Sequence, residues 1–252
     1  MTNRLVTIPI SHFCEKARWA LDRAGIEYVE QPHVQLVHVF AARLAGGGRT
    51  VPVLVTESNV IAESGAILRW SDGHVSADRR LYPEGELGDE AAAIEAALDL
   101  GLGPDGRLWM YHQTLPVVRQ LEPWALAGVP GWEQRLFRVA APLVDRMIRR
   151  VLGVDQASAR EALVRVEAVF DDVARRLSDG RPFLLGDRFT AADLTFAALA
   201  APMLLPAGYG SPLPPPEAMP EKMSREVRRL RAHPAGDFAS RMYADERRRS
   251  SA

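Results

Sequence analysis

The chain has 252 residues, of which 47% are apolar, and its formal net charge is −1. A chain of this length can bury a sizeable core and is expected to form two domains. Phosphate binding needs a concentrated basic surface, so this charge balance argues against a nucleic-acid-binding protein. The most basic stretches, Arg225–Arg231 and Arg247–Arg249, have acidic residues in or beside them and predict a solvated helix face.

Cys14 is the only cysteine, so no intrachain disulfide can form and nothing indicates a secreted scaffold. The sequence shows no charged-then-apolar leader and no run of about 18 apolar residues. These features predict a cytoplasmic protein that does not span a membrane.

The first predicted domain, residues 1–78, alternates short β-branched runs with amphipathic helical ones. This pattern is typical of a small α/β sheet with crossover helices. The predicted strands are 5–8, 28–34, 53–56 and 60–61, and the predicted helices are 14–24, 37–44 and 64–72.

The stretch Ser11-His12-Phe13-Cys14 lies where the first predicted strand ends and the first helix begins. Unpaired backbone N–H groups and the positive end of the helix dipole meet at such a junction. A thiolate can be held there.

Two more polar junctions follow in the same domain. Val51-Pro52 places a proline at the start of a β-branched run, where either a cis bond or a plain strand-edge proline is expected. Glu63-Ser64 places a carboxylate and a hydroxyl at the head of the next helix.

Residues 79–88 are predicted to be a linker, and residues 89–252 an all-helical domain. The amphipathic segment Ala157–Leu177 stops at Ser178-Asp179-Gly180, which ends a helix. The proline-rich segment 205–220 contains too many prolines to be helical, so it is predicted to be an extended surface linker or a lid near a substrate pocket.

The stretch Phe189-Thr190-Ala191-Ala192-Asp193-Leu194 combines two features of a helix start. Thr190 and Asp193 have the spacing of a capping box, and Phe189 with Leu194 has that of a hydrophobic staple. We expect this motif to stabilise the fold and to take no part in chemistry.

In this order and spacing, the SxxCxK, VPVL, ESGAI and FTAADL motifs resemble the glutathione transferase superfamily, with a serine-type N-terminal motif like that of the theta and zeta classes. The resemblance implies a thioredoxin-like N-terminal domain and an all-helical C-terminal domain. It also implies glutathione as co-substrate, a small electrophile as second substrate, and a homodimer; no metal is expected.

The resemblance assigns the first position of the SxxC motif, Ser11, to activation of the thiol, with plain helix capping as the alternative. Cys14 is either a buried structural residue or a reactive thiol. In redox relatives the reactive cysteine occupies the first position of this motif, which is Ser11 here, whereas Cys14 occupies the fourth. A two-cysteine exchange mechanism is excluded by the cysteine count.

The remaining candidates are expected to bind substrates. Val51 and Pro52 would pair with the cysteinyl part of glutathione, and Glu63 and Ser64 with its γ-glutamyl head group. Arg49, with Arg43 and His38 as rivals, would bind the glycyl carboxylate. His12 and Phe13 are expected at the cleft wall, whereas Lys16 and Arg18 are expected to be solvated helix residues. Tyr111 is a candidate for the electrophile pocket, although an aromatic cluster at helical spacing is more often core than pocket.

The predicted function is therefore attack of an activated glutathione thiolate on a small electrophile, as in detoxification. Three alternatives stay open: a glutathione-dependent isomerase, a thiol-disulfide oxidoreductase that uses Cys14, and a noncatalytic ligand-binding protein of the same fold.

Overall fold

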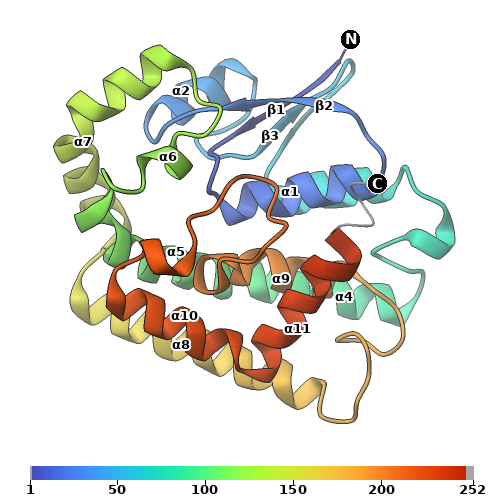
Figure 1. The fold of residues 1–252 in the computed structure, drawn as a ribbon. Coiled ribbons are helices and arrows are strands. Elements are labelled where there is room, and N and C mark those ends of the chain that lie inside the picture. The colour runs from blue at the N-terminus through green and yellow to red at the C-terminus, as the bar shows by residue number, and fades with distance from the viewer. Residues whose placement is uncertain (1, 248–252) are drawn as a thin grey trace.

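The computed structural model describes residues 2–247 and contains a four-stranded mixed sheet above a group of helices (Figure 1). The strands are β1 (Asn3–Thr7), β2 (Tyr28–Pro32), β3 (Val53–Val55) and β4 (Val60–Ala62), in the order β2-β1-β3-β4. β1 runs parallel to β2, and β3 runs antiparallel to both β1 and β4. All four strands were predicted, and their ends differ from the prediction by at most two residues.

Helices cover both faces of this sheet because its strands alternate two sets of apolar side chains. Leu5 and Leu54 pack on one face against α1 (His12–Arg23) and α3 (Ser64–Asp72). Val6 and Val53 pack on the other face against Ala42 of α2 (Val37–Leu44). The sequence predicted α2 and α3 with these bounds, and α1 begins two residues earlier than expected.

The second half of the chain is helical, as predicted. Its helices are α4 (Glu86–Leu100), α5 (Leu102–Thr114), α6 (Glu122–Ala125), α7 (Gly131–Leu152), α8 (Gln156–Arg176), α9 (Ala191–Leu204), α10 (Glu221–Arg231) and α11 (Pro234–Met242), followed by the π-helical turn Tyr243–Arg247. Short 3-10 turns lie at Ala77–Arg79, Leu115–Val117 and Pro216–Ala218. α4 starts inside the predicted linker 79–88, because the glycine at its N-cap position, Gly85, has a φ of +79° and redirects the chain into the helix.

The centre of the helical half is α9, in which every residue is buried. The predicted capping box is confirmed: the backbone N–H and the hydroxyl of Thr190 both donate to Asp193 at 2.8 Å. A third bond, from the Leu184 N–H at 2.7 Å, ties the preceding loop to the same carboxylate. Asp193 is fully buried, and burial raises its pKa to about 6.

Charged side chains on α1 are buried, which contradicts the expectation that they face water. Lys16 forms ion pairs with Glu95 at 2.8 Å and Asp99 at 2.7 Å, both on α4. Arg18 pairs with Glu30 of β2 at 2.6 Å. These pairs join α1 to its neighbours and give each buried cation an acidic partner.

Arg247 at the end of the described chain is also buried, and the prediction of a solvated face is wrong at this position. Its guanidinium pairs with Glu15 at 3.0 Å and Asp22 at 2.6 Å, both on α1. The neighbouring Arg248 and Arg249 lie outside the described residues.

The proline-rich segment 205–220 is irregular apart from its 3-10 turn, and it passes between α1 and the lower helices (orange in Figure 1). The Tyr209 hydroxyl donates to the Ile10 carbonyl at 3.2 Å, and the Gly210 N–H donates to Glu15 at 2.9 Å. The segment is therefore fastened to the start of α1 and is not a free surface linker. No helix within residues 2–247 has the length and apolarity needed to cross a membrane.

Candidate functional site

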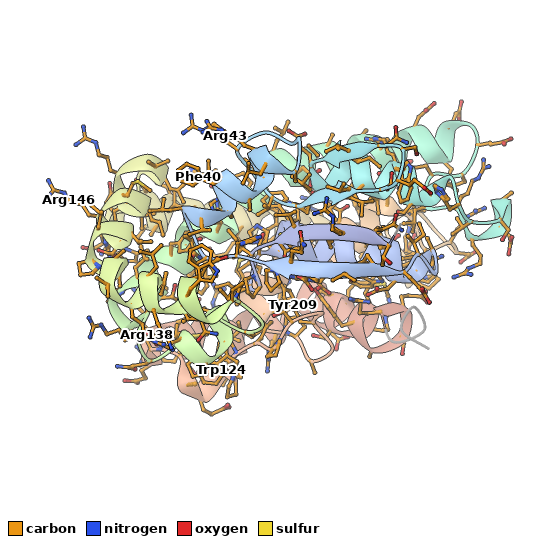
Figure 2. All side chains as sticks on the ribbon, turned by 90° about the horizontal axis from the view of Figure 1, so that it is seen from above. Phe40, Arg43, Trp124, Arg138, Arg146 and Tyr209 are labelled. Atoms are coloured by element: carbon orange, nitrogen blue, oxygen red, sulfur yellow. The ribbon has the colours of Figure 1, made fainter. Side chains whose placement is uncertain are left out.

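A cavity of about 740 Å³ opens beside the start of α1. Its walls are built by the loop before α1, by α2, by the loop 49–51 that leads into β3, and by one face each of α5 and α7. Figure 2, which looks down on the sheet, shows Phe40 and Arg43 on α2 and the course of α7 beside them. The predicted site residues that line the cavity are Ser11, His12, Phe13, Arg49, Val51 and Tyr111.

Ser11 occupies the N-cap position of α1 in extended conformation, and its Oγ accepts the backbone N–H of Cys14 at 3.4 Å. A serine hydroxyl has two acceptor lone pairs and one donor hydrogen. Accepting the cap bond leaves that hydrogen available. Capping and donation to a thiolate are therefore compatible roles for one side chain.

Cys14 lies one turn further along α1 and is fully buried. Burial raises the pKa of its thiol, and the opposing effects of the Arg18 charge and of the Ser11 hydroxyl are smaller. A reactive cysteine is normally accessible and has a lowered pKa. Cys14 has the properties of a small apolar core residue.

The Val51-Pro52 peptide bond is cis, one of the two alternatives that the sequence allowed. Val51 lines the cavity, whereas Pro52 is buried behind it and accepts the Glu63 N–H at 3.2 Å. The Val51-Pro52 and Glu63-Ser64 junctions are thus side by side, although Glu63 and Ser64 do not themselves line the cavity.

Glu63 is exposed and has a φ of +73°, which is unusual for a residue with a side chain. Such conformations concentrate at ligand sites. The next residue, Ser64, is the first residue of α3 and is buried, so the unpaired N–H groups of the helix start directly follow Glu63 in the chain. This arrangement offers an anion and an anion-binding helix end within one dipeptide.

The candidates for binding a second carboxylate differ in exposure. Arg43 and Arg49 are both exposed at the cavity wall, and His38 is half-buried beside them. Burial, followed by the charge of His33, lowers the pKa of His38, while a bond to the Val34 backbone opposes this. The two arginines are therefore the cations on this side of the cavity at neutral pH.

His12 is buried, and its Nε2 lies 3.0 Å from the Gly103 carbonyl of α5. A carbonyl can only accept, so Nε2 carries the hydrogen. Burial, followed by the Arg107 charge, lowers the pKa of His12 to about 3. The ring is neutral at physiological pH and fastens α1 to α5. The neighbouring Phe13 ring covers Gly103, where an added Cβ would lie 2.4 Å from it.

Tyr111 belongs to both the cavity and an adjoining apolar pocket of about 70 Å³. Its hydroxyl bonds with Gln35, but burial dominates and raises its pKa. The apolar pocket is also lined by Met110 and by Tyr209 of the proline-rich segment, whereas Trp109 is buried in the core. The aromatic stretch of α5 is thus shared between core and pocket.

Two features of the cavity were not predicted. Its outer wall is formed by Met147, Ile148, Val151 and Leu152 of α7. Arg107 of α5 also lines it, as an isolated cation. The amphipathic spacing of 131–152 reveals a helix, but nothing in the sequence shows that it faces α2. Within residues 2–247, no group of three or more His, Cys, Asp or Glu side chains is placed to hold a metal ion.

Comparison with protein families gives two matches. Residues 5–77 match the model described as the glutathione S-transferase N-terminal domain, and residues 156–225 match that described as the C-terminal domain. Together these ranges cover more than half of the chain, and the helices α4, α5, α6 and α7 lie between them. No curated protein sequence matches the chain.

Solved structures of similar fold extend over the whole molecule. A glutathione transferase from Phanerochaete chrysosporium is 19% identical, with a TM-score of 0.62, and the match covers 98% of this chain and 97% of that one. A glutathione S-transferase from Methylobacillus flagellatus with GSH bound is 14% identical, with a TM-score of 0.60 and 99% of both chains covered. One from Ceriporiopsis subvermispora in complex with glutathione is 17% identical, with a TM-score of 0.59, and the match covers 100% of this chain and 98% of that one. At these identities the likeness concerns the fold.

Proposed function

Because the chain belongs to the glutathione S-transferase superfamily, we propose that it binds glutathione in the 740 Å³ cavity and transfers the glutathione thiolate to a small electrophile. The observation that carries this proposal is the position of Ser11. Its hydroxyl lines the cavity at the start of α1, and its cap bond leaves the hydrogen available for a ligand sulfur.

The proposed binding mode uses the two side-by-side junctions. The cis Val51-Pro52 unit would pair with the cysteinyl backbone of glutathione, as an added strand does. Glu63 would pair with the γ-glutamyl ammonium, and the Ser64 end of α3 with the adjacent carboxylate. Arg49 or Arg43 would bind the glycyl carboxylate at the other end. The predicted homodimer and cytoplasmic location stay predictions.

In the proposed reaction the thiol loses its proton to solvent, and the Ser11 O–H donates to the sulfur anion. A hydrogen bond to a charged group stabilises it by about 1.5–3 kcal/mol, which corresponds to about one to two pKa units. The sulfur then forms a bond to the electrophilic carbon, and the leaving group departs with its electron pair. Proximity within the cavity supplies the rest of the acceleration.

Ser11→Ala tests this role against that of Cys14. We expect calorimetry to show glutathione binding to the wild-type protein, and ultraviolet titration of the bound thiolate to give a pKa about one unit or more higher in Ser11→Ala. Turnover at neutral pH should fall in that variant. Cys14→Ala should keep most activity, because the buried thiol does not reach the cavity lining.

Ser11→Thr is the matched control, because it keeps both a capping oxygen and a hydroxyl donor. It should retain the low thiolate pKa. If Ser11→Ala leaves that pKa unchanged while Cys14→Ala abolishes activity, the assignment to Ser11 is wrong and thiol exchange through Cys14 takes its place. Absence of glutathione binding to the wild-type protein would favour the noncatalytic alternative.

A further inference from the structure

Apart from Tyr111, which is neutral, the titratable side chains that line the cavity are all bases. They are His12, His38, Arg43, Arg49 and Arg107, and no carboxylate among the described residues lines this space. Two of the five are histidines whose pKa is lowered by burial, so the three arginines carry the charge at neutral pH. The cavity is therefore built for a ligand with net negative charge.

The three arginines lie on different walls. Arg43 is on α2 and Arg49 is in the loop that leads to Val51, which places both near the proposed tripeptide site. Arg107 is on α5. Gly103, Arg107 and Tyr111 follow one another at intervals of four residues, so they share one face of that helix.

This face of α5 is fixed against the start of α1. The Gly103 carbonyl accepts His12, and the Phe13 ring lies over the Gly103 Cα. Arg107 follows one turn later, close enough for its charge to act on both His12 and Tyr111. Arg107 therefore lies near His12 and Tyr111, and Tyr111 borders both the cavity and the apolar pocket.

Arg43, Arg49 and Arg107 all lack an anionic partner among the described residues, but Arg107 is half-buried whereas the other two are exposed. Arg165 pairs with Asp105 of the same helix at 2.7 Å, and Arg69 pairs with Glu95 at 3.0 Å. No carboxylate within residues 2–247 forms an ion pair with Arg107, which is nevertheless half-buried. A guanidinium presents a planar fork of donors that matches a carboxylate. Its missing partner is most simply supplied by a ligand.

We propose that the second substrate of this enzyme is an electrophile that carries a carboxylate, and that Arg107 binds this carboxylate while the apolar pocket beside Tyr111 takes the rest of the molecule. The inference rests on the proposed glutathione transfer. The charges of glutathione itself are matched by Glu63, the start of α3 and the arginines of the α2 side, which leaves Arg107 for the second substrate.

The test uses a pair of electrophiles that differ in one charge, 4-chloro-3,5-dinitrobenzoate and its methyl ester. In both, the thiolate sulfur forms a bond to the carbon that carries chlorine, the C–Cl bond breaks, and chloride leaves with the electron pair. The thiol proton goes to solvent. Each kcat/KM is divided by the rate constant of the uncatalysed reaction with glutathione, which removes the difference in intrinsic reactivity.

We expect the wild-type enzyme to prefer the carboxylate. Arg107→Gln should reduce this preference about tenfold or more, the lower end of the range for a lost hydrogen bond to a charged group, and should leave the KM for glutathione unchanged. Arg107→Lys should retain part of the preference, because it keeps the charge but loses the planar fork.

Arg43→Gln should weaken glutathione binding instead. Arg146→Gln removes a cation that points away from the molecule on α7 and should change neither (Figure 2).

A binding measurement separates this proposal from the proposed function. The unreactive 3,5-dinitrobenzoate is titrated by calorimetry into protein saturated with S-methylglutathione. Weaker binding to Arg107→Gln than to wild type supports the anion site even if no turnover is found. Equal binding to both proteins, or an Arg107→Gln effect on glutathione alone, overturns it. Failure of S-methylglutathione to bind at all counts against the proposed function.

Discussion

At the scale of single residues, His12 shows how burial decides the role of a titratable group. The sequence places it beside the proposed nucleophile site, where a histidine could act as a base or a charge. In the structure its Nε2–H is used by the Gly103 carbonyl, and its pKa is about 3. The ring therefore connects two helices and holds no charge for the thiolate.

The lowered pKa of His12 makes the protein sensitive to acid. The unfolded chain binds a proton at this residue below about pH 6.5, whereas the folded chain does so only below about pH 3. The contribution of His12 to stability is thus present above pH 6.5 and is lost as the pH falls, at about 1.4 kcal/mol per pH unit between these limits.

His12→Gln tests this linkage, because a glutamine amide can still donate to Gly103 but does not titrate. Between pH 7 and pH 5 the free energy of unfolding should fall about 2 kcal/mol more in the wild type than in the variant. Urea unfolding at both pH values measures this. An equal fall in both proteins would show that His12 is not a buried neutral ring.

Lys16 and Arg18 show why sequence reasoning failed at other charged positions. The pattern of α1 predicts its apolar face correctly, but it assigns every lysine and arginine to solvent. Both side chains can be buried because they form ion pairs with the carboxylates of residues 30, 95 and 99. Arg247 forms the corresponding ion pair with the buried Glu15. Such pairing depends on tertiary structure, which local periodicity does not contain.

At the scale of elements, the start of α9 was predictable because a capping box is a local motif. Thr190 and Asp193 contact one another within four residues, and the sequence alone identified them. The structure adds a non-local part, since the Leu184 N–H also bonds to Asp193. The motif therefore fixes both a helix start and the loop that precedes it.

Asp193→Ala should lower the free energy of unfolding by about 3 kcal/mol, because it leaves two buried backbone N–H groups and one hydroxyl without their acceptor. Chemical denaturation measures the loss, and glutathione binding by the folded variant should be unchanged. Asp155→Ala is the matched control. Asp155 caps α8 through one bond to the Ser158 N–H but is exposed, so water can replace it and the loss should be smaller. Equal losses would show that burial of Asp193 adds nothing.

The element that sequence reasoning could not place is α7. Its buried residues Phe137, Ala141, Val144 and Ile148 follow helical spacing, so the helix itself is predictable. Its packing beside α2 depends on the loops at both ends, and it lies outside both family matches. The outer wall of the candidate site therefore became visible only in the structure.

At the scale of the whole molecule, two segments from the C-terminal part of the chain contact α1, which is the first helix. Residues 209 and 210 of the proline-rich segment and Arg247 all contact the start or the side of this helix, which carries Ser11 at its N-cap. Glu15 accepts from both Gly210 and Arg247. The segment thus forms one wall of the apolar pocket through Tyr209, Leu213 and Pro214, while its backbone is held by α1.

This arrangement predicts that moving the segment changes binding of the electrophile more than binding of the thiol. Gly210→Ala is a minimal way to move it, because an added Cβ would lie 2.6 Å from Glu15 Oε2 and 2.9 Å from Arg18 Cδ, both in buried and ion-paired side chains. We expect the KM for the electrophile to rise about threefold or more, since pocket contacts of this size contribute about 1 kcal/mol. The KM for glutathione should stay unchanged, because none of its proposed contacts involves the segment.

Gly131→Ala is the control for this prediction, because an added Cβ there meets no other atom within 4 Å and the backbone does not require glycine. Both constants should be unchanged in that variant. Tyr209→Phe removes the hydrogen bond to Ile10 and the contact of the hydroxyl with Arg18, and should reproduce part of the Gly210→Ala effect. If Gly210→Ala stays folded and alters the KM for glutathione as much as that for the electrophile, the segment acts through the position of α1 and Ser11, and the apolar pocket is not the electrophile site.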